Sequence, residues 1–124
     1  MFFRDFSFRR TPVRIESEEE LLSELVRASY RGAHFCELTA DSGAKLLLGV
    51  SVTIGCAQYS EHGDDPPYLM ALAAVEFEDS SFEVDGEASP IPARFCIPMG
   101  DVSQIASVFF RNGACSELFR WELI

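Results

Sequence analysis

Two histidines and four cysteines are the residues of this chain best suited to metal binding or nucleophilic catalysis. The cysteines stand at positions 36, 56, 96 and 115, so the chain has no C-x-x-C pair of the kind found in zinc and redox sites. Each lies among apolar neighbours, which is typical of buried, reduced thiols in a cytoplasmic protein. His34 begins a segment rich in strand-forming residues and is predicted to be structural. A Cys–His pair assembled by folding stays open, because a sequence does not show proximity.

The segment Glu61-His62-Gly63-Asp64-Asp65 contains ligand types that divalent metals use. All of them fall within five positions and no second cluster supplies further ligands, so we predict a solvated acidic loop. The glycines do not gather into a phosphate-binding loop, and the motifs of α/β-hydrolases, zinc proteases and zinc deaminases do not occur. We therefore predict a binding protein and not an enzyme, with no metal and no cofactor.

Charge is unevenly distributed along the chain. There are 20 acidic and 10 basic residues, for a net charge of −10; residues 1–14 carry +3, residues 15–93 carry −13 and residues 94–124 are neutral. No Lys or Arg lies between Lys45 and Arg94, where nine acidic residues fall. Binding to nucleic acid or to an anionic membrane needs clustered cations, so neither is expected. The charge suits a basic partner, and acidity that serves only solubility is the alternative.

The length of 124 residues and the apolar content of 48% predict a single domain with a substantial core. No apolar run approaches the ~20 residues that span a bilayer. Charges among the first six residues interrupt what a signal peptide would need as an apolar stretch. These features predict a cytoplasmic protein.

Two segments have the spacing and the end signals of helices. Ser17 and Glu20 form a capping-box pattern before an apolar stripe, which predicts a helix over 18–30. Asp101 is the predicted cap of a second helix that ends at Gly113. We expect Phe109 and Phe110 of this helix to pack in the core.

Strands are predicted between and after the helices. The central ones fall at 34–39, 45–51 and 53–60, followed by an ambiguous segment at 68–77 that is interpreted as a strand. Residues 78–89 suggest a loop or loose hairpin, and 93–97 a short edge strand between prolines. Residues 117–123 alternate as a closing strand in which Trp121 is expected to pack in the core.

This order of elements predicts an α+β fold in one domain. Strands in immediate succession imply hairpins, so we expect an antiparallel sheet of about five or six strands with the two helices packed on one face. Residues 1–14 are expected to form an N-terminal arm or an edge strand.

The last third of the chain resembles the immunity protein Imm1 family of bacterial polymorphic toxin systems. The similarity rests on Ile97-Pro98, on the helix that ends Phe109-Phe110-Arg111-Asn112-Gly113, and on the final Trp121-Glu122. The middle of the chain is similar at Gly55-Cys56-Ala57-Gln58-Tyr59 and at Pro67-Tyr68-Leu69, so the resemblance covers about residues 17–124.

The resemblance implies a protein that binds one cognate toxin, one-to-one, and blocks it inside the producing cell. Such toxins are often nucleic-acid deaminases or nucleases, and enzymes of this kind need a basic groove. An acidic inhibitor would be steered to the groove and take the place of phosphates there, with aromatic anchors among the charges. The candidate interface residues lie in the stretch without basic residues: Tyr59, Glu61, Asp64, Asp65, Tyr68, Glu76, Glu78, Asp79, Glu83 and Asp85.

Two other interpretations stay open. A small enzyme or ligand-binding domain would hold His34 or His62 beside Cys or carboxylate groups in a deep pocket. A structural subunit of an assembly would use an N-terminal docking arm formed by four aromatic residues: Phe2, Phe3, Phe6 and Phe8.

Overall fold

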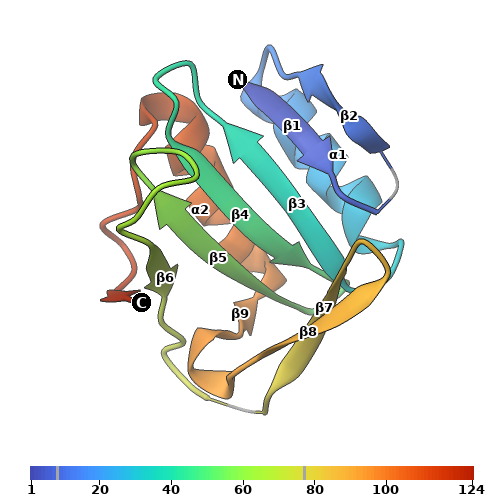
Figure 1. The fold of residues 1–124 in the computed structure, drawn as a ribbon, viewed down its shortest axis with the longest axis vertical. Coiled ribbons are helices and arrows are strands. Elements are labelled where there is room, and N and C mark those ends of the chain that lie inside the picture. The colour runs from blue at the N-terminus through green and yellow to red at the C-terminus, as the bar shows by residue number, and fades with distance from the viewer. Residues whose placement is uncertain (8, 77) are drawn as a thin grey trace.

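The computed structural model describes residues 1–7, 9–76 and 78–124, and this part of the chain folds into two α-helices and a sheet of ten strands. Both helices lie on the same face of the sheet (Figure 1), which confirms the expected α+β class. The sheet is larger than the five or six strands expected. The N-terminal segment, a second hairpin and a two-residue strand before the second helix all pair with it.

Across the main path of the sheet the strand order is β10-β6-β5-β4-β3-β1-β2, and these neighbours are antiparallel. β2 and β10 form the two edges. The three predicted central strands are confirmed within one residue at each end, whereas the segment predicted over 68–77 pairs only along β6. Phe77 lies outside the described residues. The strand bounds are β1 Phe2–Asp5, β2 Arg9–Arg14, β3 His34–Thr39, β4 Lys45–Val50, β5 Ile54–Ser60, β6 Leu69–Ala71 and β10 Trp121–Leu123.

Helix α1 (Glu18–Ser29) begins where the sequence predicts. Ser17 is extended, and its side-chain oxygen accepts the Glu20 backbone N–H at 3.1 Å. The Glu20 carboxylate reaches back to the Glu16 N–H at 3.4 Å, one residue before the partner that a capping box would use. The stripe that faces the sheet is fully buried and consists of Leu21, Leu25 and Ala28.

The start of helix α2 (Met99–Asn112) differs from the prediction. Its N-cap is Pro98 and not Asp101. The Met99 backbone N–H donates to the Thr53 carbonyl at 2.9 Å, so the chain itself satisfies a donor that a side-chain cap would otherwise take. Asp101 lies in the first turn, where the positive end of the helix dipole favours its charge.

The end of α2 is as predicted. Gly113 adopts the left-handed conformation at φ 66°, and its N–H donates to the Phe109 carbonyl at 2.7 Å. Phe109 is fully buried. Phe110 and Trp121 are partly buried and pack against the same core, which confirms the packing expected for all three aromatic residues.

Residues 80–91 form a well-defined hairpin, β7 (Ser80–Val84) and β8 (Glu87–Ile91). β7 touches the main sheet at the start of β3, where Glu83 pairs with His34 in parallel. The hairpin covers part of the sheet face opposite the helices. There Phe82 packs with Phe35 at a ring-centroid distance of 5.7 Å.

Most of the edge strand predicted over 93–97 is a turn instead. Ala93–Phe95 is a 3₁₀ helix, closed by a hydrogen bond from the Cys96 N–H to the Ala93 carbonyl at 3.1 Å. Pro92 precedes it in an extended conformation (φ −58°, ψ 148°), and its carbonyl accepts the Phe95 N–H at 2.9 Å, which starts the turn. Only Ile97–Pro98, strand β9, pairs with β5.

The closing strand predicted over 117–123 is also shorter than expected, because a local turn occupies its first residues. The Leu118 N–H donates to the Ser116 hydroxyl oxygen at 3.2 Å. The Trp121 indole N–H donates to the Ser116 carbonyl at 2.8 Å, so pairing starts only at Trp121.

Two glycines allow the layers to approach closely. A Cβ on Gly49 would lie 2.6 Å from the Cys56 sulfur and 3.0 Å from the Phe82 ring. A Cβ on Gly55 would lie 2.6 Å from a Val102 methyl on α2. These positions fix the spacing between the sheet and what packs on each of its faces.

All four cysteines are free thiols. Cys36, Cys56 and Cys96 are buried, as predicted, whereas Cys115 is partly exposed and so departs from the prediction. Burial raises the pKa of the Cys56 thiol to about 12, so this group stays protonated near neutral pH.

The N-terminal aromatic residues take part in the fold. Phe3 is buried in the main core, and Phe6 packs against the cluster beneath the hairpin. Phe2 is 41% exposed, with the Arg14 guanidinium over its ring. Phe8 lies outside the described residues. Neither α1 nor α2, the helices of the described part of the chain, has the length and apolar composition to cross a membrane.

Candidate functional site

The acidic residues of the candidate interface are all exposed. One group, here called the acidic loop, follows β5 and contains Glu61, Asp64 and Asp65. A second group, here called the hairpin acids, lies on or just before the β7–β8 hairpin and contains Glu78, Asp79, Glu83 and Asp85. Glu76 precedes them, beside the groove described below.

The fold places these two groups at opposite ends of the sheet. The acidic loop follows Ser60, the last residue of β5. Ser60 pairs with Lys45 of β4, and Lys45 pairs in turn with Thr39 at the end of β3, so the loop lies at that end of the sheet. Glu83 of the hairpin pairs with His34 at the start of β3. The six residues of this strand separate the groups by about 17 Å along the sheet. Figure 1 shows the loop after β5 at the upper end of the sheet and the β7–β8 hairpin in the lower half.

Asp64 and Asp79 are among the candidate carboxylates that have contacts within the fold. Asp64 accepts a hydrogen bond from the Lys45 ammonium at 2.9 Å, and this contact raises the pKa of Lys45. Asp79 accepts the Ala93 backbone N–H at 2.8 Å and thereby ties the segment before β7 to the 3₁₀ turn. Substitution of either residue would therefore change local structure as well as charge.

The two candidate aromatic anchors differ in setting. Tyr59 is half-buried on the helix face, edge-on to Phe109 and Trp121, and its hydroxyl donates to the Gly113 carbonyl at 3.3 Å. Tyr68 is half-buried at the acidic loop, and its hydroxyl donates to the Asp64 carbonyl. Tyr68 thus lies beside the charges it was expected to accompany, whereas Tyr59 is part of the core packing.

A groove near the C-terminus, lined by both apolar and charged residues, was not expected from the sequence. It has a volume of about 630 Å³, and residues of α2, the 3₁₀ turn and the segments flanking β6 and β10 line it. Leu118, at 79% exposure, is on its rim, and Arg94 and Arg120 contribute cations. Local sequence patterns carry little signal for it, because its walls come from four separate segments.

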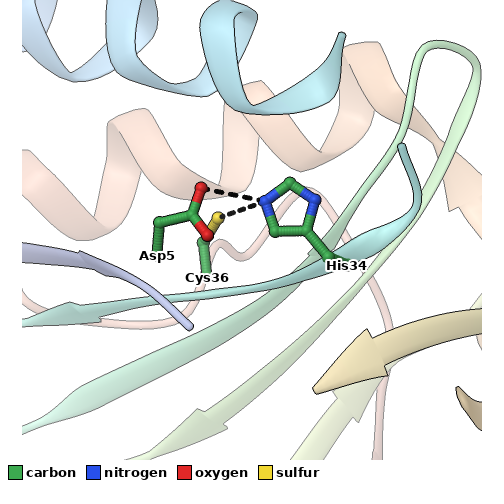
Figure 2. A group of neighbouring side chains, drawn as sticks. All are labelled: Asp5, His34 and Cys36. Carbon is green, nitrogen blue, oxygen red and sulfur yellow. Dashed lines mark hydrogen bonds and ion pairs between the residues drawn. The ribbon is translucent and has the colours of Figure 1, made fainter. Parts of the chain in front are cut away.

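The Cys–His proximity that the sequence left open occurs at His34 and Cys36, in a buried cluster that also contains Asp5 and is shown in Figure 2. His34 Nε2 lies 2.9 Å from Asp5 Oδ2 and 3.8 Å from the Cys36 sulfur. The His34 Nδ1–H donates to the Gly32 carbonyl at 2.7 Å. The only sequence signal is the His-x-Cys spacing in a strand, which puts both side chains on one face.

The geometry of this cluster is not that of a Cys–His–Asp catalytic relay. In such a relay the carboxylate binds one ring nitrogen and the nucleophile binds the other. Here Asp5 and Cys36 approach the same nitrogen of His34, and a backbone carbonyl holds the other one. The three side chains are at most 2% exposed, so substrate has no access. Burial and, after it, the Asp5 carboxylate raise the pKa of the Cys36 thiol, which disfavours the nucleophilic thiolate.

His62 is exposed in the acidic loop, and among the described residues it belongs to no group of three or more potential metal ligands. His34 is thus 2% exposed inside the cluster, whereas His62 is exposed on a loop.

Comparison with known proteins gives one finding. A search of curated proteins found no match. A family model described as immunity protein Imm1 matches residues 9–123. The match includes β2, so it begins earlier than residue 17, where the resemblance was expected to start. It covers nearly the whole chain. The chain therefore belongs to the immunity protein Imm1 family.

Proposed function

We propose that this protein binds and neutralises a cognate bacterial toxin in the cytoplasm of the cell that makes it, without catalysing a reaction. Membership of the immunity family is the observation that carries the proposal. Exposure of all eight candidate carboxylates, in a stretch without Lys or Arg, supports an electrostatic mode of binding. The partner would be a basic toxin bound one-to-one, with no direct contact to nucleic acid or membrane.

The toxin would act on nucleic acid, as a deaminase or a nuclease, because such an enzyme carries a cationic groove that acidic side chains can occupy. The acidic loop and the hairpin acids lie about 17 Å apart along the sheet, and a groove that takes several nucleotides is long enough to reach both. Steering by opposite charge would speed association to roughly 10⁸ M⁻¹s⁻¹ at low salt.

The first experiment asks whether the protein protects cells. The product of the adjacent gene, the expected toxin, is induced with and without the protein, and viable cells are counted. Survival only in the presence of the protein supports the proposal. Equal killing when the protein is abundant contradicts it, whatever surface is involved.

The second experiment asks which acids contact the toxin. One variant reverses the acidic loop with Glu61→Lys and Asp65→Lys, and the other reverses the hairpin acids with Glu78→Lys and Glu83→Lys. Asp64 and Asp79 are left intact because they hold Lys45 and the Ala93 N–H. A group that faces the groove should lower the association rate constant about tenfold or more at low salt, measured by stopped flow.

The matched control makes the same change of net charge elsewhere, with Glu19→Lys on the exposed start of α1 and Glu117→Lys after α2. It should slow association much less, because only the overall charge differs. If all three variants slow association equally, the net charge and not an acidic face steers the toxin. If neither test variant slows it, the acidic interface is wrong, while protection through another surface would stand.

A further inference from the structure

The buried cluster of Asp5, His34 and Cys36 has no part in the proposed function, and its residues come from two paired strands. Asp5 of β1 lies directly opposite Cys36 of β3 in the antiparallel register. His34 and Cys36 are two residues apart in β3, so their side chains point to the same face of the sheet, which is the face that the helices cover. Figure 2 shows the three side chains converging between β3 and the overlying helix α1.

The orientation of His34 suits it to be a ligand. Its Nδ1–H donates to the Gly32 carbonyl at 2.7 Å, so the ring is held with Nε2 directed at Asp5 and Cys36. Histidines that bind metals generally donate their other ring N–H to a carbonyl or a carboxylate in this way, which fixes the tautomer and raises the basicity of the ligating nitrogen. Asp5 is also oriented, since its Oδ1 accepts the Ser7 backbone N–H at 3.0 Å.

The donor atoms are already close to the spacing that a metal ion requires. One oxygen, one nitrogen and one sulfur lie within 4.8 Å of one another. Tetrahedral zinc, with bonds of about 2.0–2.3 Å, holds its ligand atoms about 3.3–3.8 Å apart. The 3.8 Å between Cys36 and His34 fits this spacing, and the 2.9 Å between Asp5 and His34 needs to widen by about half an ångström.

Charge also favours a divalent ion. A carboxylate and a thiolate together carry two negative charges, which neutralise Zn²⁺ and reduce the desolvation cost of a buried ion. The mixed oxygen, nitrogen and sulfur set suits zinc better than Mg²⁺ or Ca²⁺, which prefer oxygen alone.

We propose that Asp5, His34 and Cys36 form a structural zinc site. Zinc binding displaces the Cys36 S–H proton to solvent as the Zn–S bond forms, and no electron is transferred. Water or a backbone carbonyl takes the fourth position. The ion would cross-link β1 to β3 and so hold β1 on the sheet. β1 precedes the residues that the family model matches.

The test uses the full chain. The protein is produced in zinc-supplemented medium under reducing conditions, and its zinc content is measured by mass spectrometry. A second sample is refolded from denaturant with Co²⁺, which reports thiolate ligation through its sulfur-to-cobalt charge-transfer absorption. We expect about one metal ion per chain, the cobalt band, and a lower melting temperature after chelation.

Two matched variants locate the site. Cys36→Ser should lose the cobalt band and the bound zinc. Cys56→Ser, an equally buried thiol in the second cluster on the opposite face, should keep both. If Cys36→Ser does not fold, the proposal is tested by whether the unmodified protein and Cys56→Ser both show the cobalt band. Less than about a tenth of an equivalent of zinc, together with no cobalt band, would overturn the proposal and leave a metal-free Asp5–His34 contact. A cobalt band that survives Cys36→Ser would also overturn it.

Discussion

Gly49 shows how a single missing side chain sets the packing between two layers. It lies in β4 beneath the β7–β8 hairpin, and its hydrogen atom faces Cys56 and Phe82. Sequence reasoning placed this glycine correctly in a central strand. It did not reveal the crowding, because Phe82 comes from a hairpin that the sequence barely indicates.

We expect Gly49→Ala to lower the free energy of unfolding by about 1–3 kcal/mol, because the new methyl overlaps atoms on a buried face. Gly100→Ala is the control: it lies in α2 with no atom within 4 Å of its Cβ, and it should stabilise by about 0.4–1 kcal/mol. Urea denaturation measures both. Equal effects of the two substitutions would mean that the hairpin does not press on β4 in solution.

The exposure of the candidate carboxylates was predictable residue by residue, but their arrangement on the surface was not. Charge and turn composition correctly indicate exposed carboxylates around 61–65 and 78–85. Their separation depends on the strand order, which a local pattern does not specify. The Asp5 cluster is harder still to foresee, because β1 must first lie beside β3 to bring Asp5 opposite Cys36.

At the scale of elements, those with strong local signals were predicted well and short ones were not. α1 and the three central strands have clear periodicity and end signals. β9 is two residues long and β10 three, so neither has a pattern long enough to identify. The start of α2 was misplaced because its first N–H finds a backbone acceptor, Thr53, from a distant part of the chain.

The N-terminus of α1 offers a test of a local signal. Ser17→Ala removes the oxygen that accepts the Glu20 N–H at 3.1 Å, so we expect the free energy of unfolding to fall by about 1 kcal/mol. Ser23→Ala, on an exposed position of the same helix, should be neutral or slightly stabilising. Thermal melts followed by circular dichroism compare the two. An unchanged stability of Ser17→Ala would show that water replaces the cap at no cost.

At the scale of the whole molecule, the net charge of −10 is the property most relevant to a partner. It creates a long-range negative potential, which salt screens over about 10 Å at 0.1 M and about 3 Å at 1 M.

The association rate constant with the toxin should therefore fall steeply as salt rises, while the dissociation rate constant changes little. Surface plasmon resonance over a series of NaCl concentrations measures both constants. An association rate that does not depend on salt would contradict electrostatic steering, and with it the acidic mode of binding.

The two edges of the sheet bear on how the protein behaves at high concentration. β2 carries Pro12, which has no N–H to offer to a neighbouring chain, and β10 is only three residues long. An open sheet of this size would otherwise be a template for strand-by-strand growth into fibrils. At β2 and β10, short or interrupted pairing leaves little for another molecule to extend, so we expect little aggregation through these two edges when the protein is abundant.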